Sequence, residues 1–135
     1  MEQVRTNLAP RPAGHYEQAW LHNGIVYVSG QLPVDPASGP PAGGSTKPGS
    51  IEEQTERALR NVEAILTACG TRLDRVLRTT VYVSDISLWA RVNAVYARVF
   101  GDHRPARSVV PTRELHFGYQ VEIDAIAALD TSDRS

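Results

Sequence analysis

Tyr119–Leu129 (YQVEIDAIAAL) is the longest segment of this chain with a clean strand pattern. Glu122 and Asp124 alternate there with Val121 and Ile123 in strict period two. Since successive side chains of a strand point to opposite faces of a sheet, the pattern predicts a strand with both carboxylates on one face. The other segments of the chain have to pair with this strand or cover it.

A second strand pattern, Ala106–Pro111, carries Arg107 within an apolar run. Pro111 cannot donate to a strand ladder, so it either shortens this strand or places it at a sheet edge. A guanidinium inside a strand is costly unless a partner takes it up. That partner is either Glu122, in an ion pair that ties two strands together, or a ligand carboxylate, which matches the guanidinium fork at two points. The residues alone leave both alternatives open.

Two further strands are predicted upstream, over His15–His22 and Ile25–Ser29. The Asn23-Gly24 pair between them is typical of a tight hairpin turn. Gly30 then ends the second strand. A glycine in this place marks either a close approach to the backbone or, more commonly, a bulge or turn.

Two amphipathic helices are predicted in the middle of the chain. The first begins at Ser50, whose spacing to Glu53 matches a capping box, and it ends at Gly70, a residue suited to a left-handed stop. Cys69 falls on the apolar face of this helix, which favours a buried, unreactive thiol. The second helix is predicted to begin at Ser87.

A strand over Leu73–Ser84, rich in β-branched residues, separates the two helices. The resulting order, ββαβαββ, predicts an α+β fold in which one mixed sheet carries both helices on one face. Several strands have apolar residues on both sides, which would leave a large apolar patch on the uncovered face. We therefore expect an obligate symmetric oligomer whose sheets face inward.

The chain has 135 residues and a formal net charge of −1, which fits a single domain and gives no basic surface for nucleic acid. We expect residues 1–14 to be an extended lead-in, residues 33–49 a mobile surface loop, and residues 130–135 a frayed tail.

The single cysteine excludes an intrachain disulfide and a thiolate zinc site, and the histidines lack metal-site spacing. No apolar run has the length of a membrane span, and the N-terminus lacks a secretory signal, which favours a cytoplasmic protein.

Taken together, several short segments resemble the RidA (YjgF-type) reactive-intermediate deaminase family. They run in order over residues 14–127 and are Gly14–Tyr16, Val28–Asp35, Glu53–Thr55, Asn61–Leu66, Thr79–Val83, Val92–Tyr96, Pro105–Ser108 and Val121–Ala127. The resemblance implies a chorismate-mutase-like α+β fold and a homotrimer with a central barrel of sheets. It also implies active sites in the clefts between subunits.

Members of this family hydrolyse 2-imino acids, or their enamine tautomers, to 2-keto acids and ammonia without a cofactor. The resemblance implies that Arg107 grips the substrate carboxylate and that Glu122 positions and activates the attacking water, roles that suit the chemistry of both groups. Arg78 matches a position that is often basic. The implied substrate-binding residues are Tyr16, Ser29, Gly30, Asn93 and Val109.

The chain departs from the family pattern near the implied site. Val109 stands where well-known members carry a cysteine, which leaves its backbone carbonyl as the group able to hold water. His116 and Phe117 replace part of the usual Leu-Pro turn, and they either specialise the pocket or pack the loop.

The alternative functions are those of a pathway-specific relative, such as an aminomuconate-type deaminase or a biosynthetic enzyme on a larger substrate, and of a non-catalytic trimer that binds keto acids. The charge balance argues against a ribonuclease.

Overall fold

The structure, a computed structural model, describes residues 1–41 and 48–129. Within these residues six strands form one sheet in the order β1-β2-β3-β6-β4-β5, and two α-helices pack against it. The strands are β1 (Glu2–Val4), β2 (Ala19–His22), β3 (Ile25–Gln31), β4 (Val76–Val83), β5 (Ala106–Pro111) and β6 (Val121–Ala128). The helices are α1 (Ile51–Ala68) and α2 (Trp89–Phe100), with short 3-10 turns η1 (Leu73–Arg75), η2 (Ile86–Leu88) and η3 (His116–Gly118).

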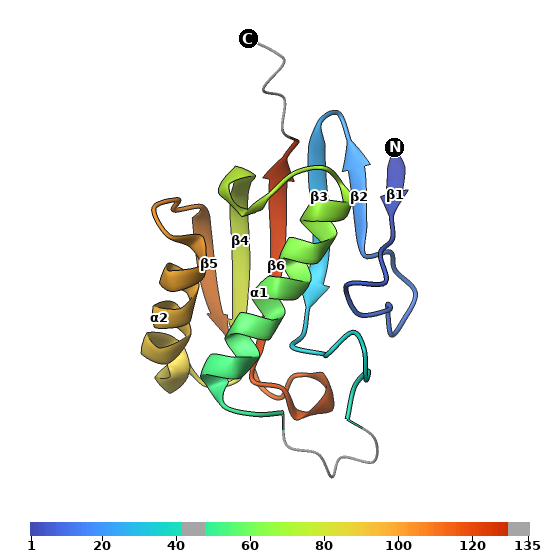
Figure 1. Cartoon of the computed structure of the whole chain (residues 1–135). Coiled ribbons are helices and arrows are strands. Elements are labelled where there is room, and N and C mark those ends of the chain that lie inside the picture. Colours follow the sequence, from blue (N-terminus) through green and yellow to red (C-terminus); the bar gives the residue numbers. More distant parts are fainter. Residues whose placement is uncertain (42–47, 130–135) are drawn as a thin grey trace.

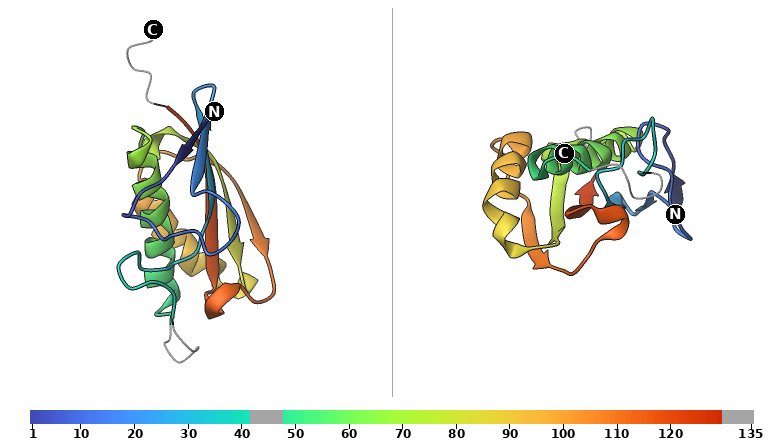
Figure 2. Two further views of the ribbon diagram at one scale, coloured as in Figure 1. Left: turned by 90° about the vertical axis from the view of Figure 1, so that its right-hand side faces the viewer. Right: turned by 90° about the horizontal axis from the view of Figure 1, so that it is seen from below.

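The predicted mixed sheet is confirmed. β6 lies between β3 and β4 and runs antiparallel to both, while β4 and β5 run parallel. Side chains of β6 alternate between buried and half-buried positions, and Val121 and Ile123 are fully buried. Both helices cover the same face of the sheet, as predicted (Figure 1; Figure 2, left). β5 is an edge strand, which explains how it accommodates Pro111.

The N-terminal prediction needs two corrections. The lead-in contains a strand, because β1 pairs with β2 through Glu2 opposite Leu21. The predicted strand over His15–His22 begins only at Ala19. The buried amide of Gln18 accepts a hydrogen bond from Thr6 N at 2.7 Å and donates to Thr6 O and Pro10 O at 3.0 and 2.9 Å. These bonds fold residues 5–18 into a loop that cannot continue the strand ladder.

The first helix begins and ends as predicted. Ser50 Oγ accepts from Glu53 N at 3.1 Å, and Glu53 Oε1 accepts from Ser50 N at 3.1 Å, which completes the capping box. Gly70 adopts φ +81°, and Thr71 N donates back to Leu66 O at 3.0 Å in a Schellman-type closure.

The remaining element boundaries differ from the predictions by a few residues. η1 and η3 lie just before β4 and β6, so both strands begin later than predicted. α2 begins at Trp89 instead of Ser87, because Asp85 Oδ1 accepts from Ser87 N at 2.8 Å and caps the 3-10 turn η2. The predictions for residues 42–47 of the loop and for the tail 130–135 lie outside the described residues. No helix among the described residues is long and apolar enough to cross a membrane.

The second face of the sheet carries exposed apolar side chains. Trp20 on β2 pairs with Tyr27 on β3, which pairs with Ile126 on β6, so the three share one face. Trp20 and Tyr27 are 39% and 48% exposed. Val110 on β5 pairs with Tyr82 on the same side of the sheet and is 37% exposed. Since both described helices lie on the other face, this is the uncovered apolar surface that the strand patterns predicted.

Two buried polar side chains of α1 fix the segments at the ends of β3 and β6. Asn61 is fully buried and donates to Leu32 O and Val34 O at 3.0 and 2.9 Å. Gln54 accepts from Gln120 N at 2.8 Å, just before β6 begins. The helix therefore sets the backbone path of both segments as well as covering the core.

Asn61→Ala is expected to lower the free energy of unfolding by about 1–3 kcal/mol, because it removes the donor from the buried Val34 carbonyl and the part-buried Leu32 carbonyl. Urea denaturation at one fixed protein concentration measures the change. Asn7→Ala is the matched control, because Asn7 is exposed. A loss for Asn61→Ala no larger than that of the control would contradict this role.

Candidate functional site

Glu122 lies on the uncovered face of β6, close to an irregularity in β3. The pairing of β3 with β6 shifts register between Val28 and Gln31, so Ser29 and Gly30 form a bulge. A Cβ atom on Gly30 would overlap the Glu122 carboxylate. The two alternatives for Gly30 therefore hold together: it belongs to a bulge, and it also allows a side chain to approach the backbone closely.

A hollow of about 440 Å³ opens in front of this carboxylate. Its walls include Tyr16, Ser29, Gly30 and Glu122, four of the residues predicted for the site. They also include His116. The Ser29 hydroxyl donates to Glu17 O at 2.6 Å, which leaves its oxygen able to accept from a ligand.

The carboxyl group of Glu122 is a stronger base than an ordinary glutamate. Burial raises its pKa above the usual value, and the nearby charge of Asp124 raises it further. Asp124 lies two residues along the same face and accepts from Thr80 N at 2.9 Å. A carboxylate with a raised pKa, next to a hollow that admits water, is suited to accept and return a proton.

Arg107 lies on the helix-covered face of the sheet and contacts α2. Its Nη1 donates to Asn93 Oδ1 at 2.9 Å. Its Cζ lies 4.7 Å from the ring centroid of Trp89 and 4.6 Å from that of Tyr96. Trp89, Asn93 and Tyr96 follow one another at four- and three-residue spacing, so one stripe of α2 faces the guanidinium.

The Tyr96 ring is itself fixed by β4. Its hydroxyl shares a hydrogen bond of 2.7 Å with Thr79 Oγ1, and burial raises the pKa of Tyr96 so that the phenol stays neutral. Thr79 pairs in register with Arg107. Arg107 thus lies among a helix stripe and two strands, and with Asn93 it lines a second hollow of about 450 Å³.

The two halves of the predicted site lie on opposite faces of the sheet. Arg107 pairs with Thr79, which is buried under the helices, whereas Glu122 pairs with Tyr82 on the uncovered side. Among the described residues, Arg107 and Glu122 share no hydrogen bond or salt bridge. The intrachain ion pair that the sequence left open is therefore not formed.

Two residues considered from the sequence lie outside both hollows. The Val109 side chain packs against the core, and Arg78 donates to Ser108 Oγ at 2.7 Å. The half-buried thiol of Cys69 has its pKa raised to about 11 by burial, which agrees with the predicted unreactive cysteine. No group of three possible metal ligands occurs among the described residues.

The sequence interpretation did not identify Trp89 or the role of Tyr96. Neither residue was among the residues that the sequence predicted for the site. The available signal was their spacing around Asn93, which puts all three residues on one side of a helix. This spacing indicates a role at the site only once Arg107 is known to lie opposite that side of the helix.

Residues 6–129 match the family described as Endoribonuclease L-PSP. The chain belongs to this family, which is also known as the YjgF/RidA family. A rat relative named 2-iminobutanoate/2-iminopropanoate deaminase is 38% identical over 124 residues, which cover 92% of this chain and 87% of that protein.

A RutC family protein of Pyrococcus horikoshii is 39% identical, with 93% of this chain and 96% of that protein covered. A crystal structure from Thermotoga maritima, described as a candidate endoribonuclease, has a TM-score of 0.87 and 43% sequence identity. That match covers 96% of this chain and 98% of the Thermotoga chain.

Glu122→Gln is expected to stabilise the protein more at pH 7 than at acidic pH. Because the pKa of Glu122 is raised on folding, the folded state holds this proton more tightly than the unfolded chain. The resulting stability is fully present below the unfolded-state pKa and is lost as the pH rises through the folded-state pKa. Charged Glu122 thus costs stability at neutral pH, and glutamine removes that cost.

Urea denaturation of wild type and Glu122→Gln at about pH 3 and about pH 7, on either side of the ordinary carboxyl range, measures this difference. The exposed carboxylate Glu114 provides the control, Glu114→Gln. An equal stability change at both pH values for Glu122→Gln would refute the raised pKa.

Proposed function

We propose that this protein hydrolyses 2-imino acids, or their enamine tautomers, to 2-keto acids and ammonia, in a homotrimer whose active sites lie between subunits. The observation that carries the proposal is that Arg107 and Glu122 line separate hollows on opposite faces of the sheet. A proton-accepting carboxylate lines one hollow, and a fixed guanidinium lines another on the opposite face of the same sheet. One small substrate can contact both groups if two subunits supply them.

Arg107 is the proposed carboxylate anchor. Asn93 takes one of its five N–H donors, which leaves enough donors for a two-point contact with a carboxylate. The rings of Trp89 and Tyr96 lie over the guanidinium and restrict its rotation. Binding the substrate at a fixed fork orients its imine carbon, which is a large source of rate enhancement in hydrolysis by a positioned water.

Glu122 is the proposed proton carrier. It takes a proton from water as the water oxygen bonds to C2 of the imine, and that proton goes to the imine nitrogen. The product is a carbinolamine. Glu122 then takes the hydroxyl proton and returns it to nitrogen while the C2–N bond breaks, which releases ammonia and leaves the C2=O bond of the keto acid. Its raised pKa helps both proton-accepting steps.

The rat relative named as an imine deaminase supports this reaction class. A relative from Lactococcus lactis, 37% identical, is named as a candidate regulator, and the family description refers to a ribonuclease. The net charge of −1 provides no broad basic surface for RNA. A pathway-specific deaminase or a keto-acid-binding trimer would use the same Arg107 anchor, and turnover of simple imino acids distinguishes them.

Arg107→Ala and Glu122→Gln are each expected to abolish accelerated ammonia release from freshly generated 2-iminobutanoate. Co-expression of the two variants in equal amounts should restore about one quarter of wild-type activity, because in a cyclic trimer with random mixing that fraction of interfaces receives both intact residues. Ammonia release in a coupled assay measures both effects, and Arg113→Ala at an exposed arginine is the control.

Complete inactivity of the co-expressed mixture, with mixed trimers confirmed by mass spectrometry, would contradict a site shared between subunits. Binding of 2-oxobutanoate by wild type without any turnover would favour the non-catalytic alternative. RNA cleavage that persists in Arg107→Ala would indicate a contaminating nuclease.

Trp89→Leu is expected to weaken 2-oxobutanoate binding about two- to fivefold, because one cation–π contact to a partly exposed guanidinium is lost. Trp89→Phe retains an aromatic face and should bind like wild type. Isothermal titration calorimetry measures both affinities. Equal weakening by leucine and phenylalanine would contradict a positioning role for the ring.

A further inference from the structure

The wall of the hollow around Arg107 carries positive charge from more than one residue. His103 and Arg104, in the connector between α2 and β5, line it together with Arg107, and the described residues of this wall include no aspartate or glutamate. The Tyr96 phenol stays neutral because burial raises its pKa, and an imidazole is either neutral or positive. A ligand carboxylate on Arg107 therefore leaves a second positive charge in the same hollow without a partner.

Arg104 supplies that second charge. It is exposed, and it makes no hydrogen bond, salt bridge or ring contact with any part of the chain that the structure describes. The arginines of α2 differ, because Arg91 and Arg98 each pair with a carboxylate of α1 at 2.7 Å. Asp102 is the nearest acidic residue in the sequence, but it is exposed and is not part of the wall. Arg104 thus keeps all of its N–H donors for a ligand.

His103 is a restrained part of the same wall. Its Nε2 lies 2.7 Å from Val76 O, and because a carbonyl oxygen can only accept, this nitrogen carries the hydrogen. The imidazole also lies 6.3 Å from the Phe100 ring, measured between the ring centroids. The bond to β4 restrains the imidazole and leaves Nδ1 as the nitrogen available to a ligand. The wall therefore combines a restrained imidazole with the unpaired guanidinium of Arg104.

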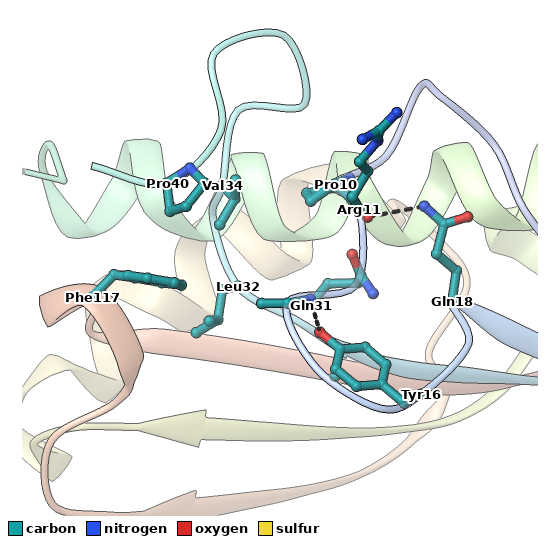
Figure 3. Close-up of a pocket in the computed structure, with 11 residues that line it drawn as sticks. Pro10, Arg11, Tyr16, Gln18, Gln31, Leu32, Val34, Pro40 and Phe117 are labelled. Carbon is teal, nitrogen blue, oxygen red and sulfur yellow. Dashed lines mark hydrogen bonds between the residues drawn. The ribbon is translucent and has the colours of Figure 1, made fainter. Parts of the chain in front are cut away.

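The hollow around Glu122 is less suited to a second carboxylate. Glu122 lines it, and the charge of Asp124 lies near enough to raise the pKa of Glu122. A smaller cavity shares Tyr16 and Gly30 with the walls of this hollow (Figure 3). Arg11 is the only charged residue among the described residues that line the smaller cavity, and Figure 3 shows its guanidinium pointing away. A second anionic group is therefore better placed on the other face of the sheet.

We infer that the hollow around Arg107 accepts dicarboxylic 2-imino acids and that Arg104 binds their second carboxylate. This inference rests on the proposed function, in which Arg107 holds the carboxylate next to the imine carbon. Arg104 and Arg107 are three residues apart, so their Cα atoms lie at most about 11 Å from each other. Each end of one small diacid can then meet a guanidinium, while the imine carbon faces the partner subunit's Glu122.

Isothermal titration calorimetry with 2-oxoglutarate and 2-oxopentanoate tests the inference, because these keto acids have the same chain length and differ in the terminal group. At low salt, wild type should bind 2-oxoglutarate about three- to tenfold more tightly, as expected for one charge-assisted contact at an exposed site. Arg104→Gln should reduce the ratio of the two affinities to about one, and Arg104→Glu should reverse the preference. Arg113→Gln changes the net charge equally at an exposed residue outside the hollow and should keep the wild-type ratio.

Ammonia release gives a second measurement, with the imino acids of glutamate and norvaline generated in situ by amino-acid oxidases. The kcat/KM values should show the same preference in wild type and lose it in Arg104→Gln. Equal affinities in wild type, or a ratio that persists in both Arg104 variants, would overturn the inference and leave the hydrolysis of simple imino acids intact. A ratio that depends on Arg104 without any turnover would uphold the binding site and overturn the proposed reaction. Failure of wild type to bind either keto acid would overturn both proposals.

Discussion

The site depends on the close packing of the Glu122 carboxylate against the backbone of Gly30. β3 and β6 can bring these residues together because the register shift at Ser29 and Gly30 moves the β3 backbone out of the regular ladder. A side chain at residue 30 would occupy the space of the carboxylate. Burial also removes water from Glu122, and this loss of solvation is the main cause of its raised pKa. The absence of a Cβ atom at residue 30 thus allows the carboxylate to lie against the β3 backbone.

The sheet then separates this carboxylate from Arg107. Strand geometry sends alternate side chains to opposite faces, and the register of β4 with β5 and β6 assigns Arg107 and Glu122 to different faces. No side-chain rotation can bring them together across a packed sheet. Their cooperation in one reaction therefore requires an assembly. The exposed Trp20 and Tyr27 on the uncovered face supply apolar area of the kind that such an assembly buries.

Local signals predicted most of the fold. The alternation around Glu122, the cap at Ser50 and the edge position of Pro111 each depend on a few neighbouring residues, and each was confirmed. The errors at the N-terminus arose from contacts between distant segments. Strand β1 has three residues and exists through its pairing with β2, and the start of β2 is set by Gln18 bonding to residues 6–10. Such contacts leave no periodic signal in the sequence.

For the site, too, the sequence predicted individual residues but not the contacts that depend on distant segments. The family resemblance pointed to Arg107 and Glu122, but it could not give their faces, since a face depends on the pairing register. It also gave no role to Trp89. An arginine is distinguished from a lysine at an anchor by its planar, polarisable group, which stacks on aromatic rings and presents a fork. Two rings and Asn93, all on α2, surround the guanidinium of Arg107 and fix its orientation. These surroundings of Arg107 therefore suit the two-point carboxylate contact that we propose.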